Sequence, residues 1–170
     1  THNVEALVDI AELLQNQPDI LFQIIGRGPR KAVLERVVSE RQLPNCQFLP
    51  FQSDEMFPYS LGAADMGVVI LDESTSKGSV PSKSYNLMSY GIPSLYIASE
   101  DSQLALYAAK YEHGKCFKKS DLQTAADWIA ETANKSEEMK RLSENAITAS
   151  SDFKRANADK FVVKYCNEST

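Results

Sequence analysis

The chain has 170 residues, of which 43% are apolar, and its 23 acidic and 18 basic residues leave a net charge of −5. This length is enough for one domain with its own hydrophobic core. The acidic balance and the lack of a Lys/Arg cluster argue against a nucleic-acid-binding protein. No apolar run approaches the roughly 20 residues that a membrane-spanning helix needs. We therefore expect one globular domain over residues 1–170.

The cysteines and histidines exclude several kinds of site. Cys46, Cys116 and Cys166 are odd in number and far apart, which is typical of free thiols in a reducing compartment. No signal peptide is visible, so we expect a cytoplasmic location. His2 and His113 are the only histidines, and their separation argues against a His-rich metal site or a His-based catalytic triad. We predict neither a cofactor nor a metal.

Apolar spacing predicts alternating helices and strands. Asn3–Asn16 has the spacing of an amphipathic helix, and Ile20–Ile25 is an apolar run typical of a strand buried on both faces of a parallel sheet. Further helices are expected from Pro29 and over residues 55–64, 79–91 and 102–111, and further strands over residues 46–49, 66–71, 95–98 and 116–117. This alternation predicts an α/β fold with a Rossmann-like, doubly wound parallel sheet.

The two ends of the chain depart from simple alternation. After Phe117 the spacing predicts C-terminal helices over residues 122–133, from Ser136 onward, and over Lys154–Tyr165. At the other end, the chain opens with a helix, whereas a doubly wound sheet normally opens with a strand and a phosphate-binding turn. We therefore expect the first strand to be missing and the chain to be a fragment of a longer protein.

Two short turns follow predicted strands, at the carboxyl ends where open α/β sheets bind ligands. In Gly26-Arg27-Gly28 the glycines allow close backbone approach and Arg27 could pair with a phosphate, although the turn lacks the full dinucleotide and P-loop motifs and is equally consistent with a plain tight turn. After the next strand, Phe51 could stack on a base, or could be a core residue beneath a turn. Asp72 ends a later strand, where it could bond sugar hydroxyls or remain solvated.

The stretch Ser79–Pro93 has the pattern of a helix with a polar first turn. Ser79 is a plausible N-cap, Pro81 suits the first turn, and Gly91 stands where a helix ends in a left-handed conformation. The N-terminus of a helix attracts anions, and Lys83 with two hydroxyls in the same turn would hold a phosphate. The same features also fit an ordinary capped surface helix.

Four segments together resemble successive blocks of the C-terminal domain of GT-B-fold glycosyltransferases of the group 1, retaining type. They are Ile24–Pro29, Phe48–Phe51, Ala63–Asp65 and Val80–Pro93, and the Pro-Ser-Lys block ending in Gly-Ile-Pro is the most specific. In such enzymes this domain binds a nucleotide-diphospho-sugar donor, and an N-terminal domain holds the acceptor. The resemblance implies that residues 1–170 are a single donor-binding domain and that the acceptor domain lies outside this chain.

The resemblance also implies roles for individual residues. The glycine turn would line the cleft that faces the donor, the segment from Leu49 to Gln52 would hold the base largely through backbone groups, and the polar turn at residues 79–83 would meet the diphosphate or the sugar. Asn86 stands where many members carry a glutamate that bonds the ribose, and an amide can still bond a hydroxyl. The predicted donor-binding residues are Gly26, Arg27, Gly28, Phe51, Ser79, Val80, Ser82, Lys83 and Asn86. No catalytic residue is predicted in this chain.

By this resemblance, the full-length protein is a hexosyl transferase that moves a sugar to a glycan or lipid-linked acceptor. The Pro-Ser-Lys pattern implies bacterial surface polysaccharide synthesis, with peripheral association at the cytoplasmic membrane face. The chain alone is expected to bind donor nucleotide weakly and to catalyse nothing. Two alternatives stay open: a GT-B-fold nucleotide-sugar 2-epimerase and a non-enzymatic, flavodoxin-like binding module.

Overall fold

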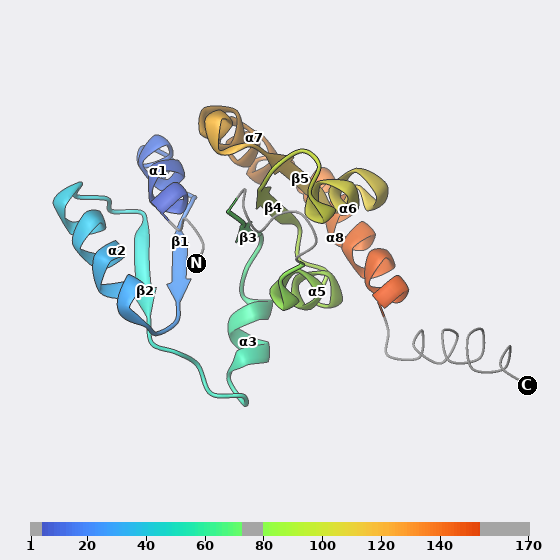
Figure 1. Cartoon of the computed structure of the whole chain (residues 1–170), viewed down its shortest axis with the longest axis horizontal. Coiled ribbons are helices and arrows are strands. Elements are labelled where there is room, and N and C mark those ends of the chain that lie inside the picture. Colours follow the sequence, from blue (N-terminus) through green and yellow to red (C-terminus); the bar gives the residue numbers. More distant parts are fainter. Residues whose placement is uncertain (1–4, 73–79, 154–170) are drawn as a thin grey trace, which may run out of the picture.

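A computed structural model describes residues 5–72 and 80–153 and shows an α/β fold with parallel strands (Figure 1). Its elements are α1 (Glu5–Leu13), β1 (Phe22–Ile25), α2 (Pro29–Glu40), β2 (Cys46–Leu49), α3 (Phe57–Gly62), β3 (Gly67–Ile70), α5 (Ser82–Ser89), β4 (Ser94–Ile97), α6 (Gln103–Tyr111), β5 (Gly114–Phe117), α7 (Leu122–Ala133) and α8 (Ser136–Ser150). The predicted α/β fold is confirmed. The predicted helix over Lys154–Tyr165 lies outside the described residues.

The strands form two parallel sheets that are not hydrogen-bonded to each other. β1 pairs with β2 in one sheet, and β3, β4 and β5 pair in that order in the other. A doubly wound sheet has the strand order 3-2-1-4-5-6. Here β2 and β1 match positions 3 and 2, and β3, β4 and β5 match positions 4, 5 and 6. Among the described residues no strand fills position 1, between β1 and β3.

One hydrophobic core nevertheless extends under both sheets. Helices α1 and α7 pack against each other, and their apolar faces meet side chains from all five strands. On the opposite face of the three-stranded sheet, α5 and α6 cover a second cluster that includes Val69, Tyr96 and Leu104. Successive side chains of a strand point to opposite faces, so β4, whose four residues are all buried, contributes to both clusters.

The prediction that the first observed strand is buried on both faces was wrong. Phe22 of β1 is buried in the core beneath α1 and α2, but Gln23 is exposed and Ile25 is 38% exposed. Leu21, on the same face as these two, is 55% exposed. Among the described residues, helices therefore cover only one face of β1, although its apolar sequence resembles that of a fully buried strand.

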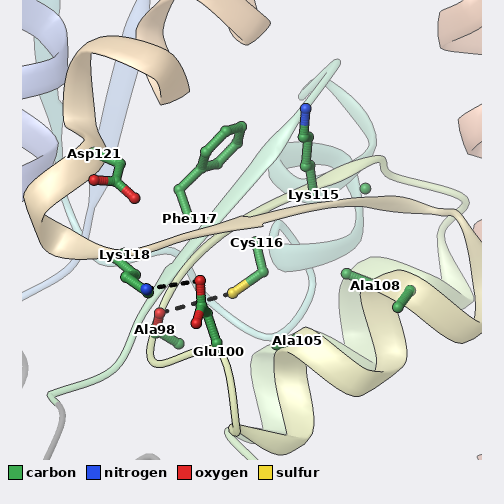
Figure 2. A pocket seen from close by; sticks show the side chains of 11 residues that line it. Ala98, Glu100, Ala105, Ala108, Lys115, Cys116, Phe117, Lys118 and Asp121 are labelled. Atoms are coloured by element: carbon green, nitrogen blue, oxygen red, sulfur yellow. Dashed lines mark hydrogen bonds and ion pairs between the residues drawn. The ribbon is translucent and has the colours of Figure 1, made fainter.

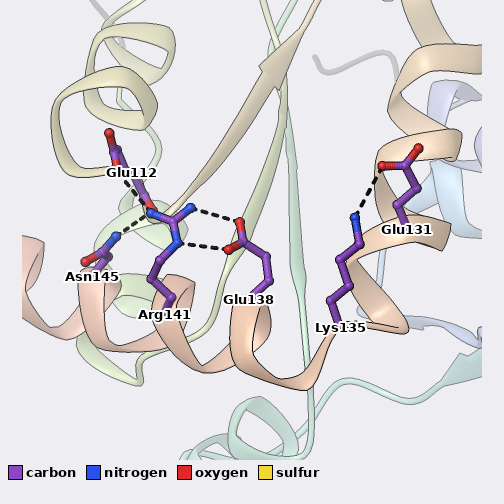
Figure 3. Close-up of polar contacts among 6 residues, drawn as sticks. All are labelled: Glu112, Glu131, Lys135, Glu138, Arg141 and Asn145. Atoms are coloured by element: carbon purple, nitrogen blue, oxygen red, sulfur yellow. Dashed lines mark hydrogen bonds and ion pairs between the residues drawn. The ribbon is translucent and has the colours of Figure 1, made fainter.

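Polar contacts and close packing hold α8 against the rest of the domain. Arg141 of α8 bonds Glu138 and reaches Glu112 at the end of α6 at 2.9 Å, while the Asn145 amide donates to the Glu112 carbonyl (Figure 3). Helix α8 also packs along α5, where a Cβ on Gly91 would lie about 3 Å from Ile147. Gly91 has φ of +66°, which confirms its predicted left-handed conformation after the helix. Helix α5 is thereby fixed in place by α8.

Candidate functional site

The turn between β1 and α2 brings two predicted residues together. Gly28 has φ of +127°, a conformation that favours glycine, and Pro29 then begins α2. This geometry directs Arg27 toward the segment after β2, where its guanidinium carbon lies 4.5 Å from the centre of the Phe51 ring. A cation over an aromatic face is stabilised by the ring quadrupole. Phe51 is 58% exposed, so it is a surface residue and not part of the core.

The backbone that leads into Phe51 is held by two side chains. The Leu49 carbonyl accepts a hydrogen bond from Nζ of Lys31 at 3.0 Å, and the Pro50 carbonyl accepts one from Nε2 of Gln52 at 2.8 Å. Sequence reasoning missed Lys31. The available signal was its position in the first turn of the helix that follows the glycine turn, on the same edge of the sheet.

The first turn of α5 differs in detail from the prediction. Pro81 has extended backbone angles and occupies the N-cap position, so it precedes the helix instead of lying in its first turn. The predicted cap, Ser79, lies outside the described residues. Val80 is half-buried, and Ser82 and Lys83 begin the helix with exposed side chains. The first turn of the helix thus carries a hydroxyl and a lysine side chain that is only partly covered by the protein.

Lys83 is a cation in a partly dehydrated setting. Its side chain reaches solvent, yet the surrounding protein desolvates the ammonium group and lowers its pKa. No carboxylate of the described residues forms an ion pair with it. An anion bound at this helix end would compensate for the lost hydration, so Lys83 is suited to pairing with a phosphate.

Asn86 lies one helical turn after Ser82. Residues four apart on a helix share a face, and both side chains are exposed, so their polar groups line one side of α5. Ser84 points the other way: it is fully buried, and its hydroxyl has no partner among the described residues. Within those residues, no hydrogen bond, ion pair or ring contact joins this face to Arg27 or Phe51. The predicted residues therefore form two groups, one at the β1–β2 edge and one on α5.

A hollow of about 310 Å³ beside β5 contains none of the predicted residues (Figure 2). It is lined by alanines of α6 and by Cys116, and an ion pair of 2.7 Å joins Lys118 and Glu100 at its rim. Burial raises the pKa of the Cys116 thiol, which keeps it protonated and unreactive. The hollow lacks a reactive group and is not a candidate catalytic site.

Metal sites and membrane spans can be assessed over the described ranges. In residues 5–72 and 80–153, no three His, Cys, Asp or Glu side chains are grouped so that they could hold a metal ion. Over the same ranges, none of the helices combines the length and the apolar character needed to cross a bilayer.

The chain belongs to the family of group 1 glycosyl transferases, whose pattern matches residues 1–149. It is 33% identical over 88 residues to a putative colanic acid biosynthesis glycosyl transferase, WcaI, of Escherichia coli K12. It is also 33% identical over 86 residues to the UDP-glycosyltransferase TURAN of Arabidopsis thaliana. These matches cover 52% and 50% of this chain but only 21% and 18% of the two relatives.

Solved structures share the fold. The crystal structure of TarM matches 98% of this chain with a TM-score of 0.79 at 14% identity. The pneumococcal O-GlcNAc transferase GtfA, solved in complex with UDP and GlcNAc, matches 98% with a TM-score of 0.72 at 13% identity. The chain spans about a third of each of those proteins. The predicted membership of a group 1 glycosyltransferase family is confirmed.

Proposed function

We propose that this chain is the donor-binding half of a retaining, hexosyl-type glycosyltransferase. It would bind a nucleotide-diphospho-sugar and present the sugar to a glycan or lipid-linked acceptor held by another domain. The observation that carries the proposal is the first turn of α5, where Lys83 and Ser82 are exposed at a helix N-terminus. Backbone N–H groups and the helix dipole favour an anion there, and Lys83 adds a charge that would stabilise the leaving diphosphate.

The remaining predicted contacts fit the same donor. A base would stack at the exposed Arg27–Phe51 pair, where a guanidinium and an aromatic ring already lie together. The ribose hydroxyls would meet Asn86, whose amide can both donate and accept. Support for the donor class comes from the family match and from UDP in the GtfA structure.

Further polypeptide completes the domain in this proposal. The facing edges of β1 and β3 lack partners among the described residues, and the matched proteins are roughly two and a half to three times as long as this chain. One parallel strand would fill position 1 of the sheet, and a separate acceptor domain would supply the remaining catalytic groups. The chain alone would then bind donor weakly and catalyse nothing.

The name of the relative in colanic acid biosynthesis supports a role in polysaccharide synthesis. We propose that this role is in bacterial surface polysaccharide synthesis, in the cytoplasm and with peripheral association at the inner membrane face. The match to the group 1 glycosyl transferases favours a transferase over the epimerase and the binding module. Epimerisation of a nucleotide-sugar without an acceptor would instead support the epimerase.

Calorimetric titration of the chain with UDP, GDP and ADP tests the donor class, and binding of none of them would contradict the proposal. Lys83→Ala is expected to weaken binding of the preferred nucleotide by about 1.5–3 kcal/mol, the scale of a hydrogen bond to a charged group. Lys140→Ala is the matched control, because it removes the same charge from an exposed position on α8. Equal affinities for the two variants would exclude Lys83 from the site.

A further inference from the structure

We infer that Lys31 is a positioning residue that shapes residues 49–52, the base-binding segment, and so determines how the nucleobase is held. This inference rests on the proposed donor-binding function. The Lys31 side chain contacts this segment through the Leu49 carbonyl, and its backbone N–H donates to the Gly28 carbonyl in the preceding turn at 3.1 Å.

The contact spans two elements that are distant in sequence. Lys31 lies in the first turn of α2, and its ammonium group donates to the carbonyl of Leu49, the last residue of β2, at 3.0 Å. The side chain is only 25% exposed, and its other charged neighbour, Glu35, is farther away at 3.8 Å. A hydrogen bond from a charged donor in a partly buried setting is stronger than one between neutral groups. Lys31 is therefore ordered by the fold before any ligand arrives.

The position of this bond matters because the sheet ends there. Leu49 is the register partner of Ile25, the last residue of β1, so strand pairing no longer guides the chain beyond that point. The Lys31 bond fixes the direction in which the backbone leaves β2. The Gln52 side chain then satisfies the Pro50 carbonyl, and Arg27 holds the Phe51 ring. These three side-chain contacts thus position the backbone and the Phe51 ring beyond the last paired residues of β1 and β2.

This arrangement separates the two parts of a nucleotide. The base would meet the segment that Lys31 supports, whereas the diphosphate would meet the first turn of α5, which Lys31 does not touch. Preorganised loops bind more tightly because less order must be imposed on binding. Loss of the Lys31 bond should therefore weaken binding of the base and leave binding of a diphosphate without a base unchanged.

The test compares Lys31→Met with Arg36→Met by calorimetric titration of the chain with UDP, GDP, ADP and inorganic pyrophosphate. Arg36 is on the same helix, is 71% exposed, and carries the same charge, so its variant controls for net charge. We expect Lys31→Met to lower affinity for the preferred nucleotide about tenfold, which corresponds to about 1.4 kcal/mol, and to leave pyrophosphate binding unchanged. Lys31→Arg, which can still donate to the carbonyl, should restore most of the affinity.

Other results of these titrations would overturn either the inference or the proposed function. An unchanged nucleotide affinity in Lys31→Met would overturn the inference. An equal loss of affinity for nucleotide and pyrophosphate would also overturn it, because Lys31 would then act on the phosphates. Absence of nucleotide binding by the unaltered chain would instead overturn the proposed function. If Lys31→Met fails to fold, Lys31→Gln gives the same comparison, because the glutamine side chain is too short to bond the Leu49 carbonyl.

Discussion

The two sheets of this domain are built from similar apolar sequences but reach very different degrees of burial. All four residues of β4 are buried, whereas β1 buries only Phe22. In residues 5–72 and 80–153, β4 has a strand on each side and helices over both faces, while β1 has one neighbouring strand and helices over one face. The three-stranded sheet therefore carries most of the packing, and the two-stranded sheet depends more on individual polar contacts.

This difference bears on how the candidate site is held. The α5 part of the site is attached to the well-packed half, through Leu87 and Met88, which are buried, and through α8. The base-binding segment belongs to the half built on β1 and β2, the open half. None of the described helices covers the segment there, and side-chain contacts from Lys31, Gln52 and Arg27 fix its position instead. Few buried contacts mean low local stability, which is common at ligand-binding loops.

The largest predicted effect is a difference in stability loss between two variants, each with an apolar strand residue truncated to alanine, one in each sheet. Leu95 of β4 is fully buried, so Leu95→Ala should lower the free energy of unfolding by about 2–5 kcal/mol through lost burial and a cavity. Ile25 of β1 is 38% exposed, and Ile25→Ala should lower the free energy of unfolding by only about 1 kcal/mol. Urea denaturation of both variants measures the difference. Comparable losses would mean that the outer face of β1 is covered in solution.

A buried histidine in the three-stranded sheet's half of the domain should make the free energy of unfolding depend on pH. His113, just before β5, is fully buried; its Nε2 lies 2.7 Å from the Tyr96 hydroxyl, and its Nδ1 has no partner among the described residues. Burial lowers the pKa of His113 to about 4, compared with about 6.5 in the unfolded chain. As the pH falls from 6.5 to 4, the unfolded chain takes up a proton that the folded chain excludes. The free energy of unfolding should therefore fall by about 3 kcal/mol over this range.

Urea denaturation between pH 7 and pH 4.5 measures this dependence, and His113→Gln is the control. Glutamine keeps a polar side chain but does not titrate, so its variant should lack the part of the slope that begins near pH 6.5. Identical pH profiles for the variant and the unaltered chain would show that His113 has the same pKa in the folded and unfolded states, and would contradict the prediction. Nothing equivalent is expected of the β1–β2 half, whose described residues include no histidine.

The sequence predicted the order and type of the described elements because each is short and bounded by Gly, Pro or a polar turn. It also predicted Arg27 and Phe51 as residues of one site edge, since both follow parallel strands. It could not predict the exposure of Ile25, because an apolar run has the same pattern whether or not the neighbouring layer is present. The Lys31 hydrogen bond could not be predicted either. Its partner is a backbone carbonyl 18 residues away, and every residue has such a carbonyl, so the sequence does not indicate which one accepts.

The smallest predicted effect concerns the polar contacts that hold the open half together. Arg41, just after α2, pairs with Asp9 at 2.7 Å and with Glu12 at 2.8 Å, which ties the end of α2 to α1. These side chains are 35–46% exposed, so Arg41→Met should lower the free energy of unfolding by about 0.5–1 kcal/mol. Salt screens exposed charges, and the loss should shrink as ionic strength rises. Arg36→Met, which breaks a more exposed pair of 3.7 Å, should have no measurable effect at any salt concentration. A loss for Arg41→Met that is independent of salt would indicate that packing of the arginine stem, not charge, joins the two helices.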